Sequence, residues 1–324
     1  MLRRSSVSHG LLACLMLSQG GLLLAQNYPS KAIRVIVPFP PGGANDIAMR
    51  TLNIGLPGLL GQTVVIDNRA GAGGNVGSEI AAKTPPDGYT LLMANNSLTI
   101  NASLYKKLPY DPFRDFAPIA MTATSPNMVV VHPSLPVKNV RQLISLSKAK
   151  SSNLSFGSPG PGTGSHLAGE LFKARTGCNI LHVAYKGAGP LMVEQIGGHV
   201  EVSFTAPIVS KPHIDSGKLR ALAVTSEKRW SAMAQLPTVA ESGYPDFDVY
   251  VWVALFAPAG TPDAIISRLA RDVNKALELR EVKEHFLAAS IEIGSSTPES
   301  LNQFLKKDFA IWDKLIKAQH ISLD

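Results

Sequence analysis

Two glycine-rich turns carry the chemistry that this sequence could perform. The first, residues 35–46, reads VIVPFPPGGAND, where a β-branched run breaks at prolines and glycines before a helix-forming stretch begins. The second, residues 154–166, reads LSFGSPGPGTGSH and repeats that design. Backbone N–H groups at the start of a helix have no partners inside it, and the helix dipole makes that end positive. Each turn therefore predicts an anion site that needs no charged side chain.

The pairing of the two turns is more informative than either turn alone. Proline and glycine are common in the loops of every α/β protein, so a single turn of this kind would not indicate a ligand site. Both turns, however, follow a strand-like run and open a helix. Ligands of open parallel sheets bind beyond the carboxyl ends of the strands, which is where such turns lie. We therefore expect one small anion to be held between two similar lobes.

Enzyme motifs are missing or incomplete in this sequence. No G-x-x-x-x-G-K-[ST] loop occurs, residues 71–76 (GAGGNV) fail the dinucleotide pattern at its sixth position, and residues 157–160 (GSPG) do not form a nucleophile elbow. The eight histidines show no H-E-x-x-H motif and no metal-ligand spacing. We therefore expect no catalytic residue, metal or cofactor. His166, just after the second turn, is either a hydrogen-bond donor at the cleft edge or a structural residue.

Residues 1–25 have the pattern of a secretion signal, because Arg3 and Arg4 precede a mostly apolar stretch that ends at Ala25. The stretch is too short and too polar for a membrane span, and ordinary secretion is favoured over a twin-arginine or lipoprotein signal. Loss of the two arginines lowers the formal charge from +7 to +5. That charge helps to attract small anions but does not indicate nucleic acid. Cys178 is then the one remaining cysteine, and we expect it to be buried.

Strand-like and helix-like segments alternate along the chain, which predicts an α/β fold of parallel sheets with helices on both faces. Two strands, near residues 116–125 and 248–256, should carry the chain between lobes. Residues 26–122 and 253–324 would then form lobe 1, with the helical tail packed on it, and residues 123–252 would form lobe 2. We predict strands at 32–37, 63–67, 89–94, 116–122, 128–132, 154–156, 182–185, 200–204, 218–224 and 249–257, and helices at 46–60, 76–83, 140–149, 165–176, 189–197, 262–279, 280–289 and 298–319.

Eight blocks of sequence, in order along nearly the whole chain, point to one family. They read VPFPPGGANDIAMR, IDNRAGAGGNVGSEIAAKTPPDGYTLLM, LPYDPFRDFAPIA, FGSPGPGTGSHLAGELF, HVAYKGAGP, GKLRALAVTSEKR, LPTVAESG and LFAPAGTP. These blocks resemble the Bug solute receptors, the extracytoplasmic binding proteins of tripartite tricarboxylate transporters. The resemblance implies a type II periplasmic-binding-protein fold, with two Rossmann-like lobes joined by two crossing strands. It also implies a periplasmic location and a pocket that takes carboxylates through backbone groups and bridging waters.

The resemblance further assigns candidate ligand contacts to loops of both lobes. These candidates are Phe39, Gly42, Gly43, Asn96, Ser97, Ser158, Gly160, Thr163, Tyr185 and Thr205. Ser158, Gly160 and Thr163 would donate hydrogen bonds from the second turn. Many relatives carry an acidic residue at the position of Thr205, where it could hold an ammonium group, so its absence here disfavours an amino-acid ligand. Arg69 could pair with an anion, although an ordinary salt bridge is its expected role.

These observations predict a monomeric, non-enzymatic receptor that closes on a small carboxylate and delivers it to the membrane subunits of a transporter. Each lobe would supply part of the contacts, so the ligand favours the closed form. A receptor that presents its liganded shape to a sensor kinase is an alternative that the sequence does not separate from transport. A periplasmic hydrolase is disfavoured by the missing motifs. Citrate, smaller dicarboxylates and aromatic acids all fit the ligand class, and a dicarboxylate is favoured.

Overall fold

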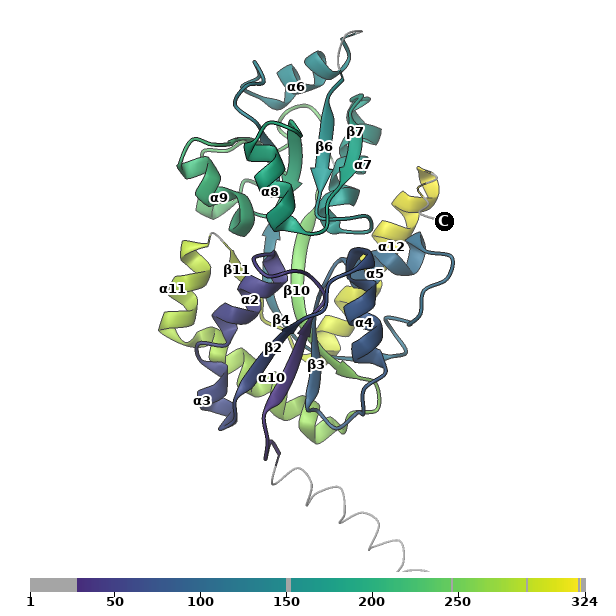
Figure 1. Cartoon of the computed structure of the whole chain (residues 1–324), viewed down its shortest axis with the longest axis vertical. Coiled ribbons are helices and arrows are strands. Elements are labelled where there is room, and N and C mark those ends of the chain that lie inside the picture. The colour runs from purple at the N-terminus through teal and green to yellow at the C-terminus, as the bar shows by residue number, and fades with distance from the viewer. Residues whose placement is uncertain (1–27, 150–152, 246, 290, 320, 322–324) are drawn as a thin grey trace, which may run out of the picture.

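The computed structural model describes residues 28–149, 153–245, 247–289, 291–319 and 321 (Figure 1). The predicted signal segment, residues 1–25, lies outside them. Two β-sheets, one above the other in Figure 1, form the centres of two lobes. We call the part built on the larger sheet lobe 1 and the part built on the smaller sheet lobe 2. The strands are β1 (Ile33–Val37), β2 (Val64–Asn68), β3 (Thr90–Asn95), β4 (Phe116–Pro126), β5 (Met128–Val131), β6 (Ser155–Ser158), β7 (Leu181–Ala184), β8 (Val202–Thr205), β9 (Arg220–Val224), β10 (Tyr250–Pro258) and β11 (Glu292–Ile293).

The two sheets share one topology over five strands, and β11 is an additional edge strand of the larger sheet. The larger sheet has the strand order β11-β4-β10-β3-β1-β2, and the smaller sheet has the order β7-β6-β8-β5-β9. In lobe 1, β1 lies between its parallel neighbours β2 and β3, and the antiparallel strand β10 follows β3. In lobe 2, β6 lies between the parallel strands β7 and β8, and the antiparallel strand β5 follows β8. The two glycine-rich turns are therefore equivalent, since one follows β1 and the other follows β6.

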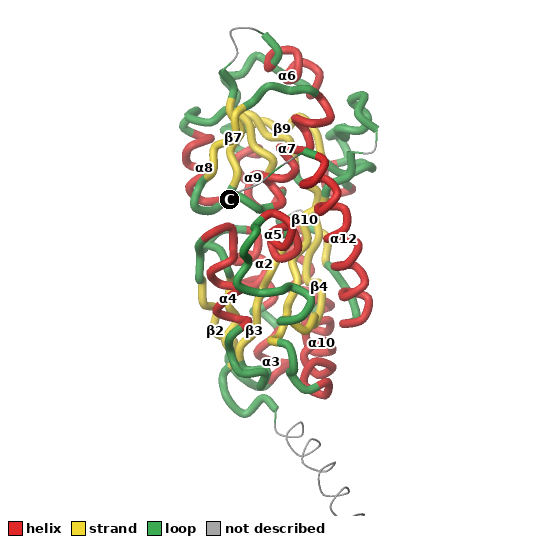
Figure 2. The backbone as a smooth tube through the Cα atoms, turned by 90° about the vertical axis from the view of Figure 1, so that its right-hand side faces the viewer, coloured by secondary structure: helices red, strands yellow, loops and turns green. Residues whose placement is uncertain are grey.

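Helices cover both faces of each sheet (Figure 2). Successive side chains of a strand point to opposite faces. Accordingly Val35 of β1 belongs to one buried apolar cluster and Ile36 to another, and Val129 and Val130 of β5 are divided in the same way. The helices are α2 (Ala44–Leu52), α3 (Leu56–Leu60), α4 (Asn75–Ala82), α5 (Ser97–Leu104), α6 (Val140–Ser147), α7 (Gly164–Thr176), α8 (Ala188–Ile196), α9 (Pro207–Asp215), α10 (Asp263–Glu278), α11 (Arg280–Ala288) and α12 (Pro298–Ala318), with short 3₁₀ turns at Ala72–Gly74 and Ser231–Met233. None of the described helices is long and apolar enough to cross a membrane.

Strands β4 and β10 run between the lobes as an antiparallel pair, from Tyr250 opposite Pro126 to Pro258 opposite Phe116 (Figure 1). β4 leads through Asn127 into β5, and Val249, just before β10, donates its N–H to Thr225 O of lobe 2. The two expected crossing strands are therefore present. The lobe boundaries predicted at residues 122/123 and 252/253 fall within these strands and stay a prediction.

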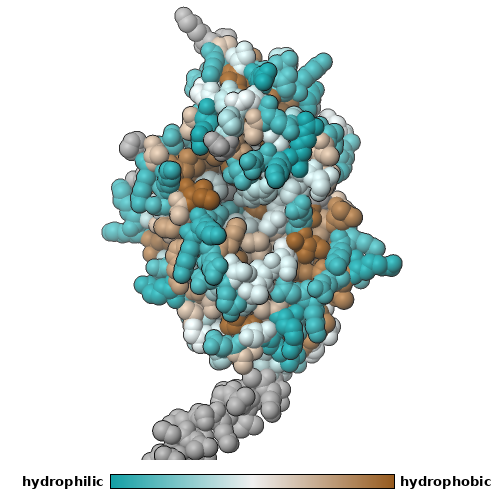
Figure 3. All heavy atoms as spheres, turned by 180° about the vertical axis from the view of Figure 1, so that it is seen from behind, coloured by the Kyte–Doolittle hydropathy of each residue, from teal (hydrophilic) through white to brown (hydrophobic). Residues whose placement is uncertain are grey.

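The helical tail contacts both lobes, whereas the sequence predicted only its packing on lobe 1. α12 packs on lobe 1 through Leu301 and Leu305, but its second half reaches lobe 2, where Trp312 and Ile316 join the core around Phe172. Figure 2 shows α12 running along one side of the molecule past the junction of the lobes. From behind, the larger apolar areas of the surface gather near that junction (Figure 3). The 21-residue helix is long enough to contact both lobes, so its packing on lobe 1 is accompanied by a contact with lobe 2 that the sequence did not predict.

Other sequence predictions also need correction. The single helix expected at 46–60 divides into α2 and α3, because Pro57 cannot continue the hydrogen-bond ladder of α2. Helices α5 and α9 were not expected: α5 is buried on most sides and lacks an amphipathic pattern, and α9 contains two prolines. The sheets are mixed rather than purely parallel, since β4, β5, β9, β10 and β11 pair in antiparallel fashion.

Candidate functional site

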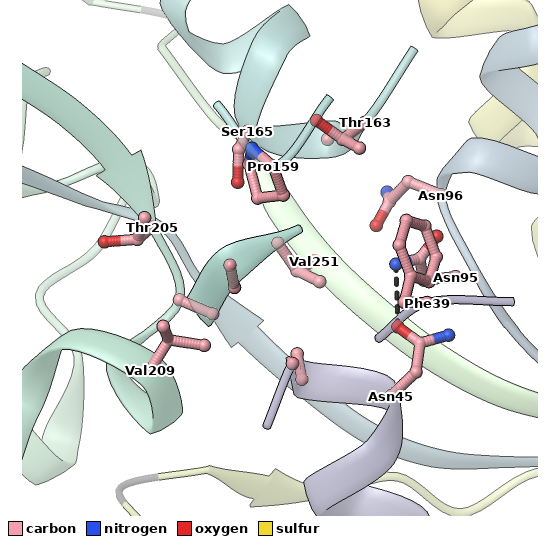
Figure 4. A pocket seen from close by; sticks show the side chains of 15 residues that line it. Phe39, Asn45, Asn95, Asn96, Pro159, Thr163, Ser165, Thr205, Val209 and Val251 are labelled. Atoms are coloured by element: carbon pink, nitrogen blue, oxygen red, sulfur yellow. Dashed lines mark hydrogen bonds between the residues drawn. The ribbon is translucent and has the colours of Figure 1, made fainter. Parts of the chain in front are cut away.

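A pocket between the lobes, with about 550 Å³ of empty space that is partly open to solvent, is the candidate functional site (Figure 4). Its wall contains the first residues of three helices, α2, α7 and α8, Ala206 and Val209 at the start of α9, and Asn96 at the start of α5. Each of these helices follows a strand of its sheet, so the shared topology of the lobes brings their N-termini together. The lining residues are Phe39, Gly43, Ala44, Asn45, Asn95, Asn96, Pro159, Thr163, Gly164, Ser165, Ala188, Thr205, Ala206, Val209 and Val251.

The start of α2 presents free backbone donors to this pocket. Gly43 precedes the helix, and no side chain caps its first turn. The nearby carboxylate of Asp46 is engaged elsewhere: it accepts hydrogen bonds from Gly42 N at 2.9 Å, Arg50 Nε at 2.8 Å and Asn68 Nδ2 at 3.0 Å. Burial alone would raise the pKa of Asp46, but these bonds hold it below its ordinary value. Asp46 therefore fixes the first turn and leaves the N–H groups of Ala44 and Asn45 available to a ligand.

The start of α7 faces the pocket from lobe 2. Thr163 caps this helix: its Oγ1 accepts a hydrogen bond from His166 N at 3.3 Å and donates one to Gly160 O at 2.7 Å. The cap leaves the N–H groups of Gly164 and Ser165 without a helix partner at the pocket wall. The hydroxyl of Ser165 points into the space between the labelled side chains (Figure 4). Ser165 thus adds a side-chain donor to the backbone donors of this turn.

Three asparagines shape the lobe 1 side of the pocket. Asn95 Nδ2 donates to Asn45 Oδ1 at 2.8 Å, the bond drawn in Figure 4, and Asn45 Nδ2 donates to Met93 O. Asn96 Nδ2 donates to Tyr250 O, and Asn96 Oδ1 accepts from Trp252 N, each at 3.1 Å. These amides are occupied by the protein itself, so they hold β3, α2 and β10 in position around the pocket.

The electrostatics of the pocket come from the backbone. Among the residues that the structure describes as its lining, none carries a charged side chain. At three of the five converging helices, α2, α8 and α9, no side chain caps the first turn, whereas Ser97 N of α5 donates to Asn95 Oδ1 at 3.0 Å. Their positive dipole ends therefore remain the main source of attraction for an anion. The absence of a carboxylate from this lining means that an ammonium group would find no counter-ion here.

The structure brings about half of the sequence-predicted candidates to this pocket. Phe39, Gly43, Asn96, Thr163 and Thr205 line it, and the hydroxyl of Thr205 is buried without a hydrogen-bond partner among the described residues. Gly160 and Tyr185 line an adjoining hollow that shares Phe39 and Pro159 with the pocket. The other three candidates line neither space: Gly42, Ser97 and Ser158.

Several lining residues escaped the sequence prediction, notably Asn45, Asn95, Ser165, Val209 and Val251. Asn45 and Ser165 occupy corresponding places, the second residue of α2 and of α7. A search for polar residues at the second helical position after each turn would have found both. Val251 lies on the crossing strand β10, and Val209 belongs to the unpredicted helix α9. Nothing in the sequence around either residue indicated that it would line the pocket.

Three residues outside the candidate list take structural roles. Arg69 Nε pairs with Asp67 Oδ1 at 2.9 Å, which confirms the ordinary salt bridge that the sequence favoured. Cys178 is a buried free cysteine, also as expected. His166 is buried and accepts a hydrogen bond from Gly162 N through Nδ1, so it is a structural residue rather than a donor at the cleft edge.

The lobes contact each other closely around the pocket. A Cβ atom added at Gly73 would overlap Pro161 O, and one added at Gly162 would overlap Asn101 Oδ1. A Cβ at Gly187 would lie 2.8 Å from Pro40 Cγ. Each of these contacts joins lobe 1 to lobe 2, and the partner of Gly162 lies on helix α5. Glycine at these positions therefore allows the two lobes to come together over the pocket.

Comparison with known proteins places this architecture in a family. The model of the tripartite tricarboxylate transporter family receptor matches residues 48–321. Protein BugT of Bordetella pertussis is 39% identical over 295 residues, covering 90% of this chain and 90% of its own length. A structure described as R. palustris Rpa4515 with adipate has a TM-score of 0.88 and 34% identity, covering 91% of this chain and all of the other. The periplasmic binding protein BugD has a TM-score of 0.87 and 32% identity, covering 91% of this chain and 99% of its own.

These similarities agree with the two-lobed α/β fold and with a pocket that lacks catalytic groups. The family consists of receptors, and the similar structures are binding proteins of the periplasmic class rather than enzymes. The expected α/β, two-lobed periplasmic-binding-protein fold and the expected non-enzymatic role as a solute-binding receptor are thereby confirmed. This chain belongs to the family of tripartite tricarboxylate transporter receptors, whose Bug-named members it resembles along most of its length.

Proposed function

We propose that this receptor captures a small dicarboxylate between its lobes and delivers it to the membrane subunits of a tripartite transporter. One observation carries the proposal: the uncapped start of α2 in lobe 1 and the start of α7 in lobe 2 line the same uncharged pocket. A carboxylate at this place receives backbone N–H groups from both lobes at once. Closure is then favoured by the ligand because only the closed form provides both sets of donors.

The expected strength of such contacts supports a useful affinity. A hydrogen bond to a charged group contributes about 1.5–3 kcal/mol. Four such donors, from Ala44, Asn45, Gly164 and Ser165, would contribute roughly 6–12 kcal/mol before the cost of association. A micromolar dissociation constant corresponds to about −8 kcal/mol, so the site can reach this range once the apolar wall adds its share.

Two further features favour a dicarboxylate over other organic acids. Five helix starts surround the pocket, which is more than one carboxylate can occupy, and the start of α8 is available to a second anionic end. The similar R. palustris receptor has been determined with adipate, which is a dicarboxylate. An α-amino acid is disfavoured, because Thr205 and the other lining residues offer no carboxylate to an ammonium group.

A panel of organic acids tests this ligand class. Purified protein would be heated with malate, succinate, adipate, citrate, benzoate, acetate and glutamate at millimolar concentration, and the stabilising acids would be measured by calorimetry. We expect saturable stabilisation by at least one dicarboxylate, with no comparable effect of acetate or glutamate. Stabilisation by glutamate alone, or by no acid in the panel, would contradict the proposal.

Delivery and location need their own measurement. We propose that the chain is exported to the periplasm by the segment 1–25 and works there as a monomer. Uptake of the labelled dicarboxylate should require both this receptor and its membrane subunits, and a receptor gene without codons 2–25 should not restore uptake. Fractionation of cells and size-exclusion chromatography then locate the protein and give its oligomeric state. Normal uptake in cells that lack the membrane subunits would contradict the transport role.

A further inference from the structure

Two histidines lie directly behind the second glycine-rich turn. His166 belongs to the first turn of α7, and His182 belongs to β7, the neighbour of β6. Their rings stack with centroids 4.1 Å apart and planes inclined by 20°. The ring of Phe156 stacks on His182 at 4.8 Å. These three stacked rings contact the turn, and neither histidine lines the pocket.

Hydrogen bonds connect both rings to the turn. His182 Nε2 lies 2.7 Å from Ser158 Oγ, and Ser158 Oγ in turn bonds with both the N–H and the carbonyl of Gly160, at 3.2 and 3.1 Å. Gly162 N donates to His166 Nδ1 at 3.3 Å. Because Ser158 Oγ accepts from Gly160 N and donates to Gly160 O, we infer that it accepts a further hydrogen bond from the N–H of His182 Nε2. Because His166 Nδ1 accepts from Gly162, its proton lies on Nε2.

The turn needs such support. Gly160 and Gly162 have φ angles of +146° and +72°, in the region that glycine enters freely and other residues avoid. A glycine-rich segment has many alternative conformations in the absence of fixed partners. The segment ends at Thr163, which caps α7, so its shape determines where Gly164 and Ser165 lie at the pocket wall.

We propose that His166 and His182 are positioning residues of the ligand site, which hold the turn from Ser158 to Thr163 in its binding shape through Nε2-protonated rings. The inference rests on the proposed function, because it assumes that the start of α7 receives the ligand. It assigns a role to the buried Ser158 as well: the hydroxyl connects His182 to Gly160 instead of contacting the ligand.

The charge state of both rings suits this role. Burial lowers the pKa of His166 to about 3, with His182 and Lys173 acting in the same direction. Burial also lowers the pKa of His182 to about 4, assisted by Lys173, whose ammonium pairs with Glu170 on the same helix. On the turn and on β6 the neighbours of the rings are the uncharged Ser158 and Phe156. A proton on His166 Nδ1 would face the N–H of Gly162, so the support from His166 works only with an uncharged ring.

Paired variants separate hydrogen bonding from packing. In His166→Asn the side-chain oxygen can replace Nδ1 as acceptor, whereas His166→Leu removes it. In His182→Gln the amide N–H can replace Nε2 as donor, whereas His182→Leu removes it. For the dicarboxylate that binds wild-type protein, we expect at least tenfold weaker binding in each leucine variant and less than threefold weakening in the amide variants. Equal affinity in all four variants, at the level of the wild type, would overturn the inference.

A serine pair covers the case in which a leucine variant fails to fold. Ser158→Ala removes the connection between His182 and Gly160, and we expect at least fivefold weaker binding. The matched control is Ser155→Ala, at the other end of the same strand, whose hydroxyl donates to Glu201 at 2.9 Å instead. Its affinity should equal that of the wild type. Unchanged affinity in folded Ser158→Ala, or equal losses in both serine variants, would overturn the inference.

Nitrogen-15 NMR of the full chain supplies a readout without ligand. Long-range proton–nitrogen spectra should identify Nε2-protonated rings for His166 and His182, unchanged between pH 5 and 8. A charged ring, or an Nδ1-protonated one, would overturn the inference even if ligand binding is normal. The absence of binding by wild-type protein to every acid in the panel would instead contradict the proposed function, which keeps the two failures distinct.

Discussion

The carboxylate of Asp308 on α12 accepts a hydrogen bond of 2.6 Å from Thr99 Oγ1 on α5, across 209 positions of sequence. Asp308 Oδ1 also accepts from Trp312 Nε1 at 3.1 Å. The side chain is only 9% exposed, and this burial raises the pKa of Asp308 to about 6 although both hydrogen bonds oppose the rise. The bond ties the tail helix to α5, whose N-terminal Asn96 forms part of the pocket wall.

The variant Asp308→Asn should change how stability depends on pH. The raised pKa means that Asp308 favours folding below about pH 4 and that this contribution is lost as the pH rises through about 6. Relative to Asp308→Asn, wild-type protein should therefore lose about 2–3 kcal/mol of unfolding free energy between pH 4 and 7. The contributions of His166 and His182 cancel in this difference. Urea unfolding at several pH values measures it, and a constant difference would contradict the assignment.

Gly162→Ala should weaken ligand binding at least tenfold. The added Cβ would overlap Asn101 Oδ1 and keep the lobes apart, so the closed form would be disfavoured. The control is Gly217→Ala in the same lobe. Gly217 has the same φ of +72° but no atom within 4 Å of the added Cβ. Both variants bear the cost of about 1 kcal/mol for a side chain in this conformation, and only Gly162→Ala should lose affinity in calorimetry. Equal affinities would show that closure does not require this contact.

Gly43→Val should abolish binding while the protein still folds. Gly43 has φ −84° and ψ 168°, which valine adopts readily, and the added Cβ would meet only Pro40 O at 3.6 Å. The new methyl groups would occupy space at the pocket wall next to the free donors of α2. Gly58→Val on α3, where the added Cβ has no neighbour within 4 Å, should leave affinity unchanged. The melting temperature shows whether each variant folds, and calorimetry measures its affinity for the ligand. Micromolar binding by Gly43→Val would exclude a ligand at this turn.

Asn96→Ala should destabilise the protein by about 2–4 kcal/mol. The truncation leaves Tyr250 O and the buried Trp252 N without their partner and removes the hydrogen bonds that join α5 to β10. Asn139→Ala provides a comparison at an exposed helix cap, where the loss of the bond from Gln142 N should amount to about 1 kcal/mol. Urea unfolding measures both variants. A loss for Asn96→Ala no larger than that for Asn139→Ala would mean that the β10 contacts contribute little.

The two glycine-rich turns show what could be predicted about the site. Each is a local feature: prolines and glycines after a β-branched run end a strand, and the next residues begin a helix. The positions of Gly43 and Thr163 at the pocket wall follow from this pattern. The direction in which a side chain points does not follow from this pattern. Ser158 has the same local setting, yet its hydroxyl turns toward His182, which reaches it from a separate strand.

The sequence by itself determined the alternation of strands and helices, the two equivalent turns, the crossing strands and the family. The structural features depend on the types of neighbouring residues, and the family is recognised from long stretches of similar sequence. Only the tertiary structure decided which helix starts converge, that α12 contacts both lobes, and that Asn96 is bound to β10 rather than free for a ligand. Those features depend on contacts between segments more than 100 residues apart. A local pattern of residue types contains no information about which distant partner will satisfy a buried polar group.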